Sequence, residues 1–191
     1  HDELTDPNQA DLRVLDSFNP REPLLQFVRE HGVTVMHAMP GRGNVIAGQT
    51  GIFRTHGRTA EQMALRFPAG MLINLGETPK AAYSGKKPGT RMATANILRA
   101  ALTSAQGYAQ RKQAAKEPPA TNLKHEALGL LLARKMPMVV AAHRADDLMT
   151  GLRIAEEFKL HAILTLATEG YLITDSIQAA KVPVILHPTM Q

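Results

Sequence analysis

The stretch MPMVVAAHRADDLMTGLRIAEEFKLHAILTLA, residues 136–167, decides the fold. It opens with the apolar run MVVAA, continues with a segment whose apolar residues recur at helical spacing, and closes with the apolar run HAILTLA. Short apolar runs that alternate with amphipathic helices are typical of parallel strands buried on both faces. The stretch therefore predicts a strand–helix–strand unit of an α/β protein.

The same alternation extends to both sides of this unit. Downstream, a helix over residues 169–181 precedes a strand that starts near Val182. Upstream, the sequence predicts strands over 33–39 and 69–76, with an irregular Gly-rich loop or short hairpin over 40–55 and a short helix over 59–67 between them. It also predicts a long helix over 90–116. The residues of this helix that we expect to face inward are Met92, Ile97, Leu98, Ala101 and Leu102. We predict a single α/β domain over residues 1–191, built from parallel strands with intervening helices. Such a chain is too short for a closed eight-stranded barrel, so the sheet is either open or part of a barrel.

The amino-acid composition argues against several classes of function. The 191 residues include no Cys, which excludes disulfides, thiolate nucleophiles and Cys-based metal sites. A formal net charge of +5 raises the question of nucleic acid, but the basic residues are scattered and only 4% of residues are aromatic, so we predict no nucleic-acid partner. No apolar run is long enough for a membrane span, and the acidic N-terminal residues do not resemble a signal peptide. We expect a soluble protein, cytoplasmic or periplasmic.

Polar side chains follow the predicted strands, where functional groups of parallel α/β proteins gather. They are His37, Asn74, Glu77, the group His143, Arg144, Asp146 and Asp147, then Thr168, Glu169 and His187. A hydrolytic metal site needs several His and carboxylate ligands and one open position for water. Glu77 and His143 have suitable chemistry, but two ligands are too few, and the pattern assigns no catalytic residue.

Structural roles compete with functional ones at these positions. Asp146 and Asp147 stand where a helix begins and can stabilise its N-terminus, while Arg144 can pair with either carboxylate. His37 on an apolar strand fits a hydrogen-bonded core residue as well as a ligand. Neither a GxGxxG fingerprint nor a GxSxG elbow is present.

A combination of motifs resembles one family. The elements PGRGNVIAGQ, LGETPK, AHRADD, TEGY and HPTMQ occur in order over nearly the whole chain. Together they resemble the imidazolonepropionase-related branch of the amidohydrolase superfamily. The resemblance implies a distorted (β/α)8 TIM barrel of the metal-dependent hydrolase type, which hydrolyses amide-like carbon–nitrogen bonds of small-molecule substrates with the help of zinc, iron or manganese.

The resemblance also implies roles for individual residues. Glu77 and His143 are the expected metal ligands, Arg144 and Asp146 are expected to support them, and His37 and His187 are further strand-end candidates. The chain resembles the middle portion of the barrel, a fragment that begins after the strand bearing the family's HxH pair and ends before the strand bearing its catalytic Asp. We therefore expect a homo-oligomer, or association with the missing barrel segment or with a related subunit.

Two positions depart from the family pattern. Relatives tend to read HxHRADD and HGTEGY, whereas Ala141 and Leu166 stand here in place of the first histidine of each motif. Neither side chain has a lone pair to donate to a metal. Two hypotheses remain open: a metal-dependent hydrolase domain with a degenerate metal site, or a non-catalytic, amidohydrolase-like binding or assembly subunit.

Overall fold

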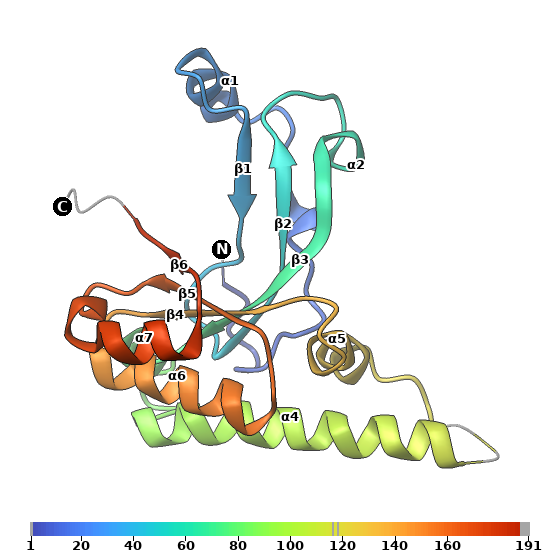
Figure 1. Ribbon diagram of the computed structural model, residues 1–191. Helices are drawn as coiled ribbons and strands as arrows, with labels where there is room; N and C mark the ends of the chain where they lie inside the picture. The colour runs from blue at the N-terminus through green and yellow to red at the C-terminus, as the bar shows by residue number, and fades with distance from the viewer. Residues whose placement is uncertain (1, 116, 118, 188–191) are drawn as a thin grey trace.

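The computed structural model describes residues 2–115, 117 and 119–187. Within these residues, strands form one six-stranded sheet in the order in which they occur in the chain. The strands are β1 (Val35–Ala38), β2 (Ile46–Arg54), β3 (Ala64–Asn74), β4 (Met138–Ala142), β5 (Ala162–Leu166) and β6 (Val184–Ile185). The sheet curls like part of a barrel wall, and helices cover its outer face (Figure 1).

Helices occupy most connections between the strands. The α-helices are α1 (Pro23–Glu30), α2 (Ala60–Met63), α3 (Glu77–Ala82), α4 (Arg91–Ala114), α5 (Leu123–Leu132), α6 (Ala145–Glu157) and α7 (Thr174–Ala180), and the 3-10 helices are η1 (Val14–Ser17) and η2 (Gly170–Ile173). In the part of the chain that is described, no helix has both the length and the apolar character to cross a membrane.

The sheet is mixed, which corrects the prediction of parallel strands throughout. β3, β4, β5 and β6 pair in parallel, and helices lie between them as predicted. β1, β2 and β3 pair antiparallel. Parallel neighbours need a crossover of a dozen or more residues. Residues 39–45 and 55–63, which join the first three strands, are too short for such a crossover.

The irregular loop or short hairpin predicted over 40–55 is wrong, because most of this segment forms one buried strand, β2, which pairs with β1 and β3. The glycines of this segment led to the prediction of a loop, but in the structure they allow the N-terminal segment to pack closely against β2. Gly48 has a φ of +125°, and a Cβ at this position would lie 2.6 Å from the carbonyl oxygen of Leu12. The N-terminal segment therefore lies directly against the strand, where the amide of Gln49 donates to the Leu12 oxygen over 2.8 Å.

The short helix predicted over 59–67 is confirmed only at its start. Thr59 caps α2 by accepting a hydrogen bond from the amide of Gln62, and β3 already begins at Ala64. β3 and β2 thus extend well beyond the parallel part of the sheet. Their far ends project with β1, α1 and α2 away from the helical layer, as Figure 1 shows.

The long helix predicted over 90–116 corresponds to α4, whose N-cap Thr90 accepts from the amide of Ala93. Leu98 and Leu102 are fully buried, as predicted. Met92 is not, because its side chain borders an open hollow and is 80% exposed. The predicted end at Lys116 lies outside the described residues.

The two faces of the sheet bury different amounts of apolar surface. The outer face packs against α4, α5 and α6 in one large cluster that includes Met71, Ile73, Val140, Leu98, Leu128 and Leu148. The inner face carries a much smaller cluster, formed by Ala47, Leu72, Val139 and Ala141 with Met39 and Leu166 packed against it. The outer cluster supplies most of the hydrophobic stabilisation, and the inner face is left to line the candidate site.

Candidate functional site

Because β3 to β6 run parallel, the polar groups that follow them gather at one edge of the sheet. His143 follows β4 and is exposed. Its Nδ1 lies 2.8 Å from Oγ1 of Thr168, which follows β5. The carbonyl oxygen of His143 also accepts from the amide of Glu169 over 2.9 Å. The ends of β4 and β5 are thus joined by a side-chain contact and a backbone hydrogen bond. The side-chain contact uses Nδ1 of His143 and does not involve Nε2.

Glu169 has a role that its position in the sequence does not reveal. Its Oε2 accepts from the amide of Ala145 over 2.9 Å, at the first residue of α6. The carboxylate therefore satisfies an unpaired N–H of a neighbouring helix and complements that helix dipole. The sequence placed Glu169 only at the start of its own predicted helix, over residues 169–181.

The two aspartates of the AHRADD motif are held by an arginine from a distant helix. Nη2 of Arg91, the first residue of α4, lies 2.6 Å from Oδ2 of Asp146 and 2.7 Å from Oδ1 of Asp147. Arg144 contacts Asp146 as well, with Nε 3.1 Å from Oδ1. Hydrogen bonds from Arg144 and then Arg91 hold the pKa of Asp146 well below its usual range. The structure therefore joins Arg144 and Asp146 in an ion-pair network.

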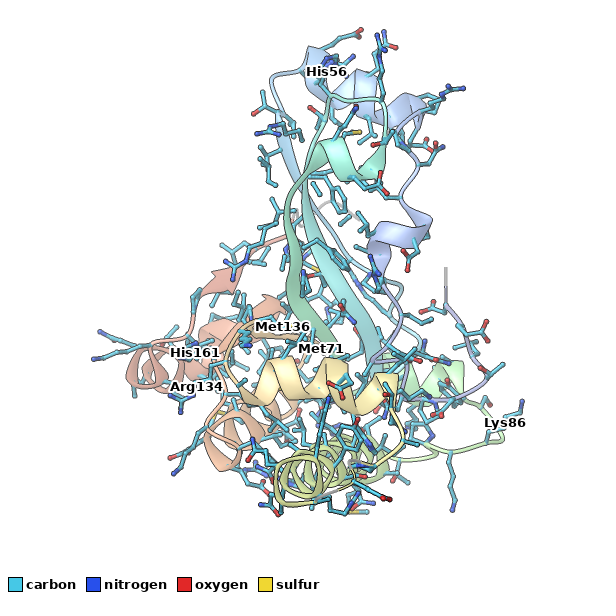
Figure 2. The ribbon with its side chains drawn as sticks, turned by 90° about the vertical axis from the view of Figure 1, so that its right-hand side faces the viewer. His56, Met71, Lys86, Arg134, Met136 and His161 are labelled. Atoms are coloured by element: carbon cyan, nitrogen blue, oxygen red, sulfur yellow. The ribbon has the colours of Figure 1, made fainter. Side chains whose placement is uncertain are left out.

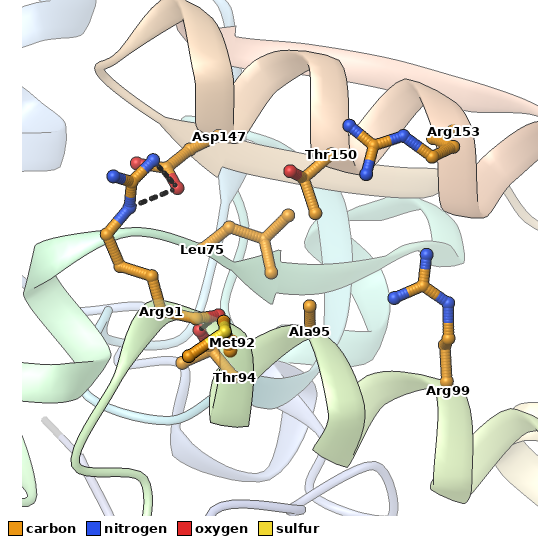
Figure 3. A pocket seen from close by; sticks show the side chains of 9 residues that line it. All are labelled: Leu75, Arg91, Met92, Thr94, Ala95, Arg99, Asp147, Thr150 and Arg153. Carbon is orange, nitrogen blue, oxygen red and sulfur yellow. Dashed lines mark hydrogen bonds and ion pairs between the residues drawn. The ribbon is translucent and has the colours of Figure 1, made fainter.

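Arg91 was missed by the sequence analysis, since nothing in its local pattern points to a partner 56 positions away. Figure 3 shows its guanidinium reaching from α4 toward Asp147. Arg91 borders a hollow of about 350 Å³ between α4 and α6. Asp147 is only 4% exposed, and Arg91 is its ion-pair partner among the described residues. Gly76 makes room for it, because a Cβ there would lie 2.6 Å from Oδ2 of Asp147.

Glu77 begins α3 and is exposed. Its Oε2 accepts a hydrogen bond from Nζ of Lys80 over 2.8 Å. This hydrogen bond lowers the pKa of the Glu77 carboxyl, so the group is an anion at neutral pH. The carboxylate is therefore engaged with a neighbouring cation of its own helix.

The other strand-end histidines each contact a threonine of the adjacent strand. Nε2 of His37 lies 2.8 Å from Oγ1 of Thr50, and burial lowers the pKa of His37, which favours the neutral imidazole. Nε2 of His187 lies 2.7 Å from Oγ1 of Thr165. The contact partners of both imidazoles are therefore threonine hydroxyl groups and not the carboxylate of Glu77.

A buried polar network lies at the end of β3. Nδ2 of Asn74 donates to the carbonyl oxygen of Asn44 over 2.7 Å, and the Tyr83 hydroxyl donates to Oδ1 of Asn44 over 2.6 Å. Asn74 is 1% exposed, and its Oδ1 has no hydrogen-bond partner among the described residues. This network fixes the loop that enters β2 against the start of the α3–α4 segment.

Apolar residues occupy the inner wall between these polar groups. Ala141 is 3% exposed and belongs to the inner cluster, and Leu166 packs against the same cluster. Leu166 and Ala167 both adopt left-handed backbone conformations, with φ of +71° and +45°. Consecutive non-glycine residues with this backbone conformation are uncommon, and strained backbone of this kind clusters at functional sites.

The described residues do not fit a metal ion. They contain no group of three or more His, Asp or Glu side chains placed to hold one. Glu77 is paired with Lys80, His143 contacts Thr168, and the wall beside them is apolar. Among the described residues, an ion at this edge would find fewer ligands than zinc, iron or manganese require.

Comparison with known proteins gives one informative match. The crystal structure of an amidohydrolase from Thermotoga maritima MSB8 superimposes with a TM-score of 0.94 at 34% sequence identity. The match covers 98% of this chain and 50% of that chain, so this chain spans about half the length of the solved protein. No family model and no curated protein matches the sequence. The similarity supports an amidohydrolase-like fold.

Proposed function

We propose that this chain is an amidohydrolase-like domain of the imidazolonepropionase-related branch, with a degenerate metal site and a non-catalytic role in binding or assembly. The observation that carries the proposal is the apolar pair Ala141 and Leu166 at the ends of neighbouring parallel strands. The motifs LGETPK and AHRADD and the similarity to a solved amidohydrolase support the family.

The chemistry of the wall argues for loss of metal binding. An alanine methyl and a leucine side chain offer no lone pair, and Leu72 and Val139 of the same cluster add none. A divalent cation placed beside this cluster would lose hydration without gaining ligands, which is strongly unfavourable. The left-handed backbone at Leu166 and Ala167 supports the idea that a ligand-bearing strand end was retained after its histidine was replaced.

A second candidate function is metal-dependent hydrolysis of amide-like carbon–nitrogen bonds in a small-molecule substrate, within a longer chain. His143 favours it, because the imidazole is exposed and oriented by Thr168. Glu77 and His143 would then hold zinc, iron or manganese, and Arg144 with Asp146 would support the strand end. This candidate requires Glu77 to exchange Lys80 for the ion.

The proposal can be tested by placing histidines at positions 141 and 166 and measuring how much metal the chain then binds. The wild-type chain and the double variant Ala141→His, Leu166→His would each be loaded with zinc, freed of excess metal by gel filtration, and measured by elemental mass spectrometry. We expect well below one zinc per wild-type chain and about one per double variant. Adding His143→Ala to the double variant should reduce this again, because His143 and Glu77 are the expected ligands that the sequence retains.

The same measurement distinguishes the two candidates. Stoichiometric metal in the wild-type chain, with hydrolysis of an amide-like substrate that chelation abolishes, would overturn the non-catalytic proposal in favour of the second candidate. A wild-type chain without metal, whose double variant gains it, supports a site lost by substitution.

The open edge of the sheet is the surface that we propose for assembly. β6 pairs with β5 on one side, and beside it lies a hollow of about 640 Å³ lined mainly by apolar residues of η2, α7 and β6 and by Ala167, which follows β5. Tyr171 and Leu186 are 72% and 79% exposed at this edge. An unpaired strand next to apolar surface favours association, and we propose a second copy of this chain as the partner.

A further inference from the structure

Three helix-to-strand turns share an unusual residue choice. Arg134 before β4, Lys159 before β5 and Lys181 before β6 all have left-handed backbone, with φ of +57°, +54° and +53°. Glycine is the usual residue at such a position, because a side chain there is strained. Because the strands are parallel, the turns lie at the same end of the sheet, opposite the candidate site.

A large cavity opens at this end. Its volume is about 960 Å³, and it lies between the starts of β4, β5 and β6 and the helices α6 and α7. Met136, Leu160 and Val182 contribute apolar surface to its wall. Arg134, Met136 and His161 mark its position in Figure 2.

The charged residues of this cavity are mostly cations. Arg66, Arg134, Arg153 and Lys181 line it, against the carboxylate of Glu156, which leaves a formal excess of three positive charges with His161 neutral. None of these five charged residues forms an ion pair with another described residue. Nε of Arg134 donates to the carbonyl oxygen of Lys159 over 2.7 Å, which leaves its Nη groups free of that bond.

We propose that this cavity binds a small amphiphilic anion, a phosphate or carboxylate group on an apolar body. Guanidinium groups bind such anions through paired N–H donors, and Lys181 adds a point charge. The apolar wall would contact the apolar body of the ligand, and the volume of the cavity lies in the range of small-molecule binding pockets. A positive cavity also raises the local concentration of anions. This proposal does not rest on the proposed role of the strand-end site, although Arg153 also borders the hollow beside Arg91.

Helix stabilisation is the competing explanation, since cations near a helix C-terminus are favourable in general. Lys159 separates the two explanations. It has the same charge, turn position and backbone conformation as Lys181, but it does not line the cavity. Replacing either lysine by glycine removes one charge at a position where glycine is unstrained, so both variants should fold.

The experiment is a calorimetric titration of the chain with phenyl phosphate, compared with inorganic phosphate and with neutral benzyl alcohol. We expect saturable 1:1 binding of phenyl phosphate, about tenfold weaker binding of inorganic phosphate, and none of benzyl alcohol. Lys181→Gly and Arg153→Gln should each weaken phenyl phosphate binding by about tenfold, whereas Lys159→Gly should leave it within about twofold. Circular dichroism would verify that each variant is folded.

Several results would overturn the proposal. They are the absence of saturable phenyl phosphate binding to the wild-type chain, an equal loss in Lys159→Gly and Lys181→Gly, and equal binding of benzyl alcohol. Equal losses would mean that diffuse positive charge, and not this cavity, attracts the anion. Should Lys181→Gly fail to fold, the phenyl phosphate affinities of Arg153→Gln and Lys159→Gly would be compared instead. Arg153→Gln should fold, because Arg153 is a helix-surface residue without an ion pair in the described chain.

Discussion

At the scale of single residues, Arg91 is the side chain on which the edge of the candidate site depends most. It contacts Asp146 and the buried Asp147 at once, so Arg91→Ala would leave a buried carboxylate without its partner. We expect a loss of about 2 kcal/mol in the free energy of unfolding at pH 7, measured by urea denaturation. Arg144→Ala is the control, because Arg144 is exposed and its removal should cost less than about 0.5 kcal/mol.

The pH dependence of this loss has a defined sign. Hydrogen bonds from Arg144 and Arg91 lower the pKa of Asp146 in the folded chain. Stability from a carboxylate with a lowered pKa is present above its unfolded value, about 4, and is lost as the pH falls below it. Arg144 still lowers the pKa of Asp146 in Arg91→Ala, so only the part that Arg91 contributes is lost, and this part of the difference from wild type should shrink below pH ~4. A difference that is constant from pH 7 to 3, or equal losses in both arginine variants, would contradict the assigned role.

At the scale of secondary-structure elements, α4 tests which helix face supports the sheet. Leu98 is fully buried against the outer face, whereas Met92 on the same helix is 80% exposed. Leu98→Ala should reduce the free energy of unfolding by about 2–5 kcal/mol, and Met92→Ala should change it by less than about 0.5 kcal/mol. Urea denaturation of both variants measures this, and comparable effects would mean that α4 packs on a different face.

The same elements explain what the sequence could predict. From β3 onward, long amphipathic helices alternate with apolar strands, and this local periodicity predicted α4, β4, α6 and β5 correctly. β2 was missed because its glycines serve close packing, which depends on the distant residue Leu12. The site was predicted in part for a similar reason. Strand-end positions follow from topology, but the contacts of Arg91 and Glu169 join segments far apart in the chain.

At the scale of the whole molecule, the curled sheet ends at β6 with one side unpaired by described residues, and apolar side chains surround that edge. Self-association would pair the edge and remove Leu186 and Tyr171 from water. We expect the sedimentation coefficient of the wild-type chain to rise with concentration. Leu186→Lys should weaken association by about tenfold or more, because it adds a charge to a surface that becomes buried.

Leu123→Lys is the matched control for this prediction, since Leu123 is 66% exposed on α5, away from the β6 edge. It should sediment like the wild type if the β6 edge forms the interface. A wild-type chain that stays monomeric at all concentrations would contradict self-association. Equal weakening by Leu123→Lys and Leu186→Lys would contradict the assigned surface, because general charge repulsion would then explain both. Association that only Leu186→Lys weakens would mean that the edge of this half-barrel is an interface between copies of the chain.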